Sequence, residues 1–139
     1  MRIVVDASVA AKWFLLEEHS PKAAALLSDN HERIAPELLV TEVAHTLVKR
    51  VRGGIVDAED ARTFLRRLFN LVEILPTVAL ASIALGLALT HQRSAYDALY
   101  AALALREGCQ LVTADRRLYD ALHASFPGTM LWIEDVESP

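Results

Sequence analysis

Apolar and polar residues alternate along the chain in blocks that favour strands and helices in turn. Short apolar runs rich in β-branched residues predict strands over residues 2–5, 33–36, 109–115 and 129–136, and a strand or connector over 71–76. Longer segments predict helices over 7–16, 20–30, 37–52, 57–70, 77–90, 94–107 and 116–126. Such alternation indicates a parallel sheet with helices on both faces. We therefore expect one α/β domain spanning residues 1–139.

Several of these helices have recognisable start and stop signals. Ser20 followed by Pro21 predicts an N-cap and a first helical residue, and Asp57 is a further predicted N-cap. Ser94 predicts the start of the helix over 94–107, and Gly108 its end. No internal repeat, low-complexity tract or long linker interrupts the series, which supports a single domain.

The most apolar stretch of the chain is TVALASIALGLALT at residues 77–90, which predicts a core helix. Its 14 residues are fewer than the roughly 18 that would suggest a membrane span. Met1 and Arg2 lead directly into the first predicted strand and show no features of a secretory signal. We therefore expect a cytoplasmic protein that does not enter a membrane.

Composition limits the function further. The chain is 53% apolar and 23% charged, a slight apolar excess that leaves room for a partner surface such as a homodimer interface. The single Cys109 cannot form an intramolecular disulfide, which fits a reducing compartment, and its surroundings favour a buried packing role. The net charge of −4 argues against a protein that holds nucleic acid through phosphate contacts alone.

Four carboxylates lie in apolar surroundings, whereas most acids of the chain lie at helix ends or on polar faces. Asp6 ends the first strand, Asp115 ends QLVTAD, and two acids lie on predicted helices, Glu42 and Asp97. The two strand-end acids project at the same sheet edge, where open α/β sheets bind ligands, and the two helical acids can reach that edge. Four converging carboxylates repel one another unless a cation neutralises them, and hard oxygen ligands select Mg²⁺ or Mn²⁺.

Each acid also has a purely structural explanation. Asp6 and Asp115 precede predicted helices, where an Asp N-cap is worth about 1 kcal/mol over Ala. Asp97 lies in a first helical turn, where the helix dipole favours negative charge. Glu42 is the hardest to explain in this way, because a buried carboxylate in mid-helix is costly unless it is paired or bound to metal. Helix caps and surface charge are thus the alternative to a metal site.

The four acids and their surroundings resemble a known family. The segments IVVDASVAAKWF, PELLVTEVAHTL, SAYDALYAALA and LVTADRRLYDAL look like the ordered signature of PIN-domain ribonucleases, specifically VapC-type toxins of prokaryotic toxin–antitoxin pairs. The match runs almost from end to end. The resemblance implies a PIN domain over residues 1–139 and a metal-dependent endoribonuclease that uses Mg²⁺ or Mn²⁺ and is held inactive by a cognate VapB-type antitoxin.

The resemblance also implies residue roles. The acidic metal-site and catalytic residues, carried over by position, are Asp6, Glu42, Asp97 and Asp115. Ser8 and Thr113 match supporting positions that could hydrogen-bond a carboxylate or a metal water; their structural explanations are a first-turn polar residue and an ordinary strand residue. Arg116, Arg117 and Leu118 follow Asp115 where some relatives of this fold carry further acids. The chain therefore gives little support for a second permanently bound metal, and leaves open one that arrives with the substrate.

On this hypothesis, a metal held by Asp6, Asp97 and Asp115 orients a water, and Glu42 coordinates through water or accepts its proton. In-line attack leaves a 5′-phosphate and a 3′-hydroxyl. Lys12 and Arg116 are the candidates for contacting substrate phosphates. The basic run over residues 49–52 has a simpler explanation in the helix dipole.

An apolar surface on the first helices is a candidate site for the antitoxin. Trp13, Phe14 and Leu16 could receive an antitoxin helix in a groove, or they could pack in the core of the domain.

Rival functions come from three other classes. Haloacid-dehalogenase-like phosphatases need a second Asp two residues after the first, where this chain has Ser8. Response-regulator-like phosphoacceptors need paired early acids and a Lys at a late strand end, and neither is evident. The non-enzymatic alternative is a catalytically inert PIN-like module that binds RNA or protein and whose acids only cap helices.

Overall fold

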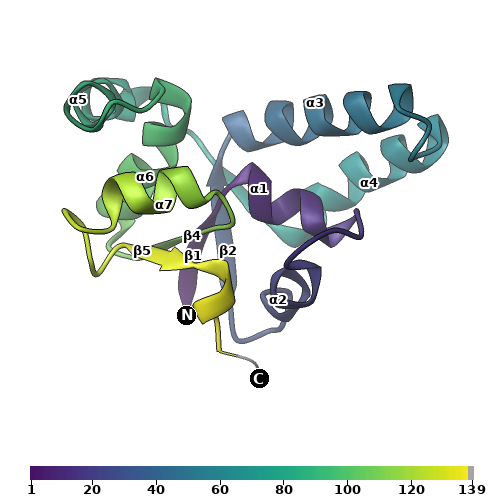
Figure 1. Cartoon of the computed structure of the whole chain (residues 1–139), viewed down its shortest axis with the longest axis horizontal. Helices are drawn as coiled ribbons and strands as arrows, with labels where there is room; N and C mark the ends of the chain where they lie inside the picture. Colours follow the sequence, from purple (N-terminus) through teal and green to yellow (C-terminus); the bar gives the residue numbers. More distant parts are fainter. Residues whose placement is uncertain (138–139) are drawn as a thin grey trace.

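A five-stranded parallel sheet organises the described part of the chain, residues 1–137 of a computed structural model (Figure 1). The strands are β1 (Arg2–Val5), β2 (Glu32–Pro36), β3 (Glu73–Leu75), β4 (Gln110–Thr113) and β5 (Met130–Trp132). They lie in the order β3-β2-β1-β4-β5, and each neighbouring pair is parallel. The predicted α/β class with a central parallel sheet is therefore confirmed.

Both faces of the sheet are covered, as the sequence predicts. Successive side chains of a strand point to opposite faces, and yet the consecutive residues Ile3, Val4 and Val5 of β1 are all 0% exposed. Helix α6 (Ala95–Glu107) packs against β1, β2 and β4. The buried alanines of this helix let it approach closely; they are Ala98, Ala101, Ala102 and Ala104.

The remaining helices connect the strands. The β1–β2 connection holds α1 (Ala7–Ala10), the 3-10 helix η1 (Ala11–Trp13) and α2 (Ser20–Ala25), and the β2–β3 connection holds α3 (Leu38–Arg52) and α4 (Ala58–Leu71). The 3-10 helix η2 (Val78–Leu80) and α5 (Ala81–His91) precede α6, whereas α7 (Arg116–Leu122) lies between β4 and β5 and the 3-10 helix η3 (Ile133–Asp135) follows β5. Asp57 and Ser94 cap α4 and α6 as predicted.

Several predicted element ends are wrong. The helix predicted over 7–16 stops after η1, and Ser20 is the first residue of α2 rather than its N-cap. The Ser20 hydroxyl donates to the Leu15 carbonyl oxygen at 3.0 Å and accepts the Glu17 N–H at 3.0 Å. These bonds close the loop between η1 and α2, so the side chain serves the turn instead of the helix terminus. The predicted segments 20–30, 116–126 and 129–136 also end early, with η3 replacing the end of the last strand.

The prediction of a core helix over residues 77–90 is wrong as well. Helix α5 lies at one edge of the molecule and packs on α6 (Figure 1). It buries the small residues Ala84 and Ala88, while Leu85 and Leu89 are 55% and 74% exposed. Small residues occupy the side that faces α6, so Leu85 and Leu89 face outward, whereas Leu87 is half-buried against the core. None of the helices within residues 1–137 is long and apolar enough to cross a membrane.

The strand order creates a crevice between β1 and β4. From β1 the chain continues to β2 and β3 on one side, and from β4 it continues to β5 on the other. Connections that leave neighbouring strands in opposite directions open a crevice at the carboxyl edge, where ligands bind in open α/β sheets. Asp6 and Asp115 follow these two strands, so the topology places both acids at the crevice.

Candidate active site

The four predicted carboxylates meet at this crevice. Asp6, Glu42, Asp97 and Asp115 line one small cavity of about 150 Å³, which we call the carboxylate cavity. They come from four separate segments, namely the turn after β1, the second turn of α3, the first turn of α6 and the N-cap of α7. The structure thus brings together side chains that are up to 109 positions apart in the sequence.

Asp6 is the most deeply placed of the four and is only 4% exposed. Its Oδ1 accepts the Ser8 hydroxyl at 2.6 Å and the Val9 N–H at 3.1 Å, and its Oδ2 accepts the Thr113 hydroxyl at 2.5 Å. Burial nonetheless raises the pKa of Asp6 to about 6, because desolvation outweighs these hydrogen bonds and the charge of Asp115 adds to it. The three hydrogen bonds therefore offset only part of the cost of burying the charged form of Asp6.

Ser8 and Thr113 join Asp6 to the turn that carries Asp115. The Ser8 oxygen accepts the Ala114 N–H at 3.0 Å, and the Thr113 oxygen accepts the Asp115 N–H at 3.0 Å. Each hydroxyl therefore donates to Asp6 and accepts from the β4–α7 turn. The two residues predicted to support the site thus fix the position of Asp6 relative to Asp115.

Glu42 is half-buried and accepts a hydrogen bond from a tyrosine that the sequence analysis did not single out. Tyr100, 2% exposed on α6, donates its hydroxyl to Glu42 Oε1 at 2.5 Å. Burial raises the pKa of Glu42, the tyrosine hydrogen bond opposes that rise, and nearby Asp97 adds to it. The signal for Tyr100 lay in its spacing of three residues from Asp97, which places both on one side of a helix.

Asp97 and Asp115 also have protein partners. Arg93, a second residue that the sequence analysis did not single out, places Nη2 at 2.9 Å from Asp97 Oδ2. Asp115 caps α7, with Oδ1 accepting the N–H groups of Arg117 and Leu118 at 3.0 and 3.3 Å. The capping role expected for Asp115 is thus real, and it leaves Oδ2 for other partners.

The two predicted phosphate-binding cations differ in their surroundings. Lys12 Nζ lies 3.1 Å from Glu17 Oε1, and Arg50 lies 3.1 Å from the other Glu17 oxygen. The Lys12 side chain is 11% exposed, so its charge is largely balanced within the protein. Arg116 is 61% exposed and pairs with Asp120 at 3.3 Å, which leaves it accessible at the edge of the site.

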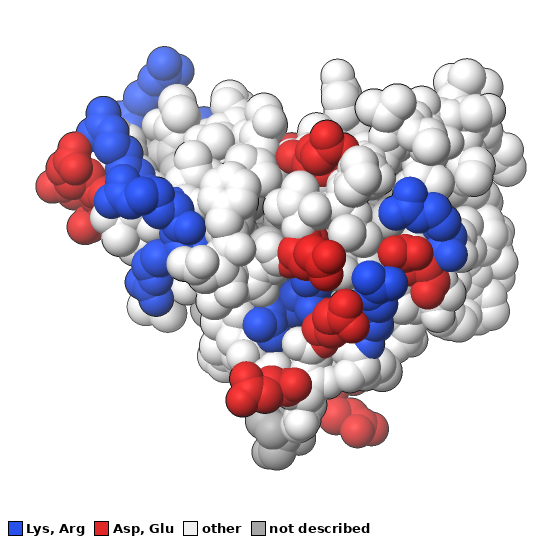
Figure 2. Space-filling view, turned by 180° about the vertical axis from the view of Figure 1, so that it is seen from behind, with Lys and Arg blue, Asp and Glu red and all other residues white. Residues whose placement is uncertain are grey.

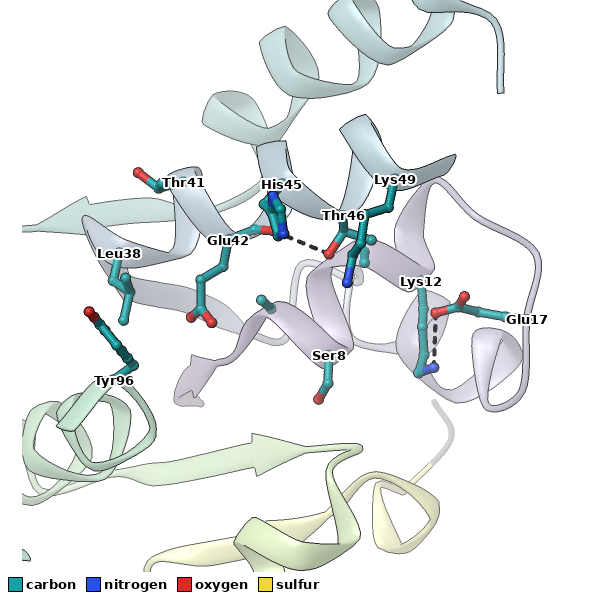
Figure 3. A pocket seen from close by; sticks show the side chains of 12 residues that line it. Ser8, Lys12, Glu17, Leu38, Thr41, Glu42, His45, Thr46, Lys49 and Tyr96 are labelled. Atoms are coloured by element: carbon teal, nitrogen blue, oxygen red, sulfur yellow. Dashed lines mark hydrogen bonds and ion pairs between the residues drawn. The ribbon is translucent and has the colours of Figure 1, made fainter. Parts of the chain in front are cut away.

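A larger cavity opens beside the carboxylate cavity. It measures about 570 Å³ and shares Ala7, Ser8 and Glu42 with the smaller one. Figure 3 shows its wall on α3, from Leu38 through Glu42 to Lys49, with Ser8 and Lys12 of the first helices opposite. Further lining residues are Thr41, His45, Thr46 and Tyr96. We call this space the α3 cavity; it gives a substrate room directly next to the carboxylates.

The four carboxylates offer the type of oxygen ligand that a hard divalent cation prefers, although in this arrangement they do not surround a common point. Within residues 1–137, no three His, Cys, Asp or Glu side chains converge closely enough to hold a metal as they stand. Their oxygens instead face protein donors, such as Tyr100 at Glu42 and Arg93 at Asp97. Carboxylate oxygens are the preferred ligands of Mg²⁺ and Mn²⁺. The set therefore fits such a cation chemically, and binding it requires these side chains to rotate.

Comparisons with known sequences agree with this architecture. A family model described as PIN domain matches residues 3–123. Ribonuclease VapC3 of Pyrobaculum aerophilum is 35% identical over 127 residues, covering 89% of this chain and 97% of that protein. Ribonuclease VapC9 of Mycobacterium tuberculosis is 38% identical over 133 residues, covering 93% and 98%.

Solved structures agree as well. The crystal structure of PAE2754 from Pyrobaculum aerophilum has a TM-score of 0.75 at 24% identity, covering 96% of this chain and 85% of that one. A toxin–antitoxin complex from Klebsiella pneumoniae has a TM-score of 0.64 at 14% identity, covering 96% and 99%. These likenesses show the fold. With the family model spanning most of the sheet and two relatives above 30% identity along nearly the whole chain, this chain belongs to the PIN domain family.

Proposed function

We propose that the chain is a metal-dependent endoribonuclease and the toxin of a toxin–antitoxin pair. One observation carries the proposal: four carboxylates from four segments line a single cavity at the β1–β4 crevice. The relatives named as VapC ribonucleases support the same reaction class. Helix caps alone would explain Asp115, but they do not explain why Glu42 and Asp97 line the same cavity as the two strand-end acids.

The chain's own residues divide the work of hydrolysis. Asp6, Asp97 and Asp115 would hold Mg²⁺ or Mn²⁺, which would neutralise phosphate charge and lower the pKa of water. Glu42 accepts the proton of the attacking water, and burial raises its pKa, which makes it a stronger base than an exposed carboxylate. Tyr100 holds one oxygen of Glu42 and leaves the other to face the cavity. In-line attack of this water on phosphorus breaks the bond to the 3′ oxygen, which takes a proton from solvent, and the products are a 5′-phosphate and a 3′-hydroxyl.

The substrate strand enters through the α3 cavity. Its 570 Å³ is ample for a nucleotide, and Lys49 and His45 in its lining can donate hydrogen bonds to phosphate. Lys12 contacts a phosphate only by giving up its pair with Glu17. Figure 2 shows Lys and Arg gathered along one edge of a chain whose net charge is −4. Exposed cations of the α3–α4 arm include Arg52, Arg62, Arg66 and Arg67.

Cleavage of total cellular RNA by the purified protein tests the proposal. We expect discrete fragments with Mg²⁺ or Mn²⁺ and none with EDTA. Asp97→Asn and Asp6→Ala are expected to lose at least 100-fold of the activity, on the scale of other essential catalytic groups. Asp60→Asn is the matched control, because Asp60 also lies in the first turn of a helix but is exposed on α4.

The outcomes separate the enzyme from the inert module. Metal-dependent cleavage that disappears in Asp97→Asn and persists in Asp60→Asn supports the ribonuclease. A folded protein that neither binds Mn²⁺ nor cleaves any RNA would instead leave the four acids as caps and surface charge.

The antitoxin is proposed to dock on the loop between η1 and α2. An apolar depression of about 400 Å³ is lined there by residues including Trp13, Phe14 and Pro21, and Leu16 is 98% exposed. One solved neighbour is itself a toxin–antitoxin complex. An amphipathic antitoxin helix would cover this surface, which a free protein would otherwise expose to water.

Co-expression with a candidate VapB-type antitoxin tests the docking surface. Leu16→Asp is expected to lose the co-purified partner while the chain stays folded. Ile55→Asp is the control, since Ile55 is an apolar residue 68% exposed on a different loop. Loss of the partner in both variants, or in neither, would place the interface elsewhere.

A further inference from the structure

A cluster of aromatic and cationic side chains beside the carboxylate cavity takes no part in the chemistry described above. Arg116 of α7 lies over two rings, with its guanidinium carbon 4.9 Å from the centroid of Trp132 and 5.4 Å from that of Tyr119. We call these three residues the stacking cluster. The sequence motifs gave no functional role to Trp132 or Tyr119.

The cluster is held in place from several sides. The Tyr119 and Trp132 rings lie 6.0 Å apart at 58°, and His19 meets Trp132 edge-on at 5.5 Å. His123 stacks on the Tyr119 ring, with the ring centroids 4.7 Å apart and an interplanar angle of 3°. Asp120 fixes the guanidinium from its own helix at 3.3 Å. These contacts orient a planar cation on a half-buried indole before any ligand arrives.

The cluster lies at the same sheet edge as the carboxylates. Trp132 ends β5 and pairs in register with Thr113 of β4, whose hydroxyl binds Asp6. Arg116 directly follows Asp115, which lines the carboxylate cavity. A strand of nucleic acid with its phosphate at the carboxylates therefore has its neighbouring nucleotide within reach of the cluster, on the α7 side of the site.

The outer face of the cluster is open. The Arg116 side chain is 61% exposed although it stacks on Trp132. A guanidinium plane supported by an aromatic ring is a surface on which nucleobases stack, and such stacking needs a base that is not paired within a duplex. Arginine is suited to this role because it is planar and always charged.

We propose that an unpaired nucleobase next to the scissile phosphate stacks on the Arg116–Trp132 pair. The inference therefore assigns the contact with that base to Arg116 and Trp132. This inference rests on the proposed ribonuclease function and deepens it. It also changes the role of Arg116 from a point charge for phosphate to a planar platform for a base.

Intrinsic fluorescence can observe the platform directly, because the chain has only two tryptophans. Trp13→Phe leaves Trp132 as the single reporter, and Trp132→Phe leaves Trp13, which lies on η1 and donates to the Ala23 carbonyl oxygen. The probe is a 12-nucleotide single-stranded RNA in EDTA, which prevents cleavage, with the same strand annealed to its complement as comparison. We expect saturable quenching by the single strand in Trp13→Phe only, and little quenching by the duplex.

Substitutions of Arg116 separate stacking from charge. Arg116→Lys keeps the charge and removes the plane, so it is expected to weaken single-strand binding roughly 5-fold or more without changing the salt dependence of the affinity. Arg116→Ala is expected to weaken binding at least as much. A lysine variant that binds like wild type, together with a weak alanine variant, would make Arg116 a phosphate contact and overturn the platform.

Failure of this inference is distinguishable from failure of the function. If the wild type cleaves RNA with Mg²⁺ and binds the probe by anisotropy while Trp132 fluorescence stays constant at saturation, the platform is wrong and the ribonuclease stands. If the wild type neither cleaves nor binds RNA, both are wrong. Quenching at Trp132 with equal affinity for strand and duplex would overturn the preference for unpaired nucleotides.

Discussion

Asp6 stabilises the fold as the N-cap of α1, but burial of its charged carboxylate destabilises the fold. It accepts hydrogen bonds at the start of α1 as a good cap does, and it is also buried among three other acids around one cavity. A structural cap would be solvated or fully paired, whereas burial raises the pKa of this carboxyl to about 6. A residue kept at such a cost is expected at a functional site.

The raised pKa of Asp6 predicts how the metal-free protein responds to pH. The folded state binds the Asp6 proton more tightly than the unfolded state, whose pKa is near 3.8, so stability falls as pH rises from about 4 to about 6. The loss is about 3 kcal/mol for this residue. Urea unfolding in EDTA from pH 4 to pH 8 measures it, and Asp6→Asn should remove this part of the profile. Superimposable profiles would show that Asp6 ionises without cost.

Arg93 is expected to compete with a metal cation for Asp97. Its guanidinium lies 2.9 Å from Asp97 Oδ2, and both side chains are about three-quarters buried. We expect Arg93→Gln to tighten Mn²⁺ binding several-fold, because the carboxylate is then free to rotate toward the cavity. Isothermal titration calorimetry measures the change. Arg106→Gln, at the other end of α6, is the control; weaker Mn²⁺ binding in Arg93→Gln would show that the arginine helps to position Asp97 instead.

At the scale of elements, hydrogen bonds to the β4–α7 turn fix the position of Asp115 relative to Asp6. Thr113 is 0% exposed and serves both Asp6 and the Asp115 N–H. Ser8 ties the same turn to α1 through the Ala114 N–H. The acids on two neighbouring strands are thus held by hydroxyls, and their separation depends on these bonds.

Thr113→Val is predicted to remove two of these hydrogen bonds without changing the size of the side chain. It leaves the Asp115 N–H and one Asp6 oxygen without a partner, and we expect a loss of about 1–3 kcal/mol in stability together with reduced cleavage. Thermal unfolding and the RNA cleavage assay measure both effects. Thr113→Ser keeps the hydroxyl and should behave like wild type; equal losses in both variants would assign the effect to the methyl group.

At the scale of the whole molecule, the exposed apolar surface of α5 is a candidate interface for self-association. Leu85 and Leu89 lie one helical turn apart and are 55% and 74% exposed. Surfaces of this kind on a folded domain are typical of interfaces. The homodimer expected from the apolar excess of the sequence stays a prediction, and α5 is where we place it.

Light scattering after size exclusion tests this placement. The double substitution Leu85→Glu and Leu89→Glu is expected to convert a dimer into a monomer, whereas Ile55→Glu on a distant loop should not. A wild type that is monomeric at high concentration would leave the α5 surface to another partner.

The sequence alone determined the fold class and the expectation that four acids meet at one edge of the sheet, because both depend on local patterns. Buried β-branched runs and helix signals give the parallel sheet, and an acid directly after such a strand, as at Asp6, can only lie at the carboxyl edge. Glu42 stood out because a mid-helix carboxylate among apolar residues has no local reason to be there.

Tertiary structure decided what each of these residues contacts. The Tyr100–Glu42 hydrogen bond and the Arg116–Trp132 pair join different elements, so spacing within one helix can place Tyr100 beside Asp97 but cannot show which residue it contacts. The same holds for Lys12, whose charge is balanced by a neighbour in the following loop, and for α5, whose outer face is set by the alanines that pack on α6. Local patterns determine which elements form, whereas packing between elements determines which side chains are buried, paired or left open.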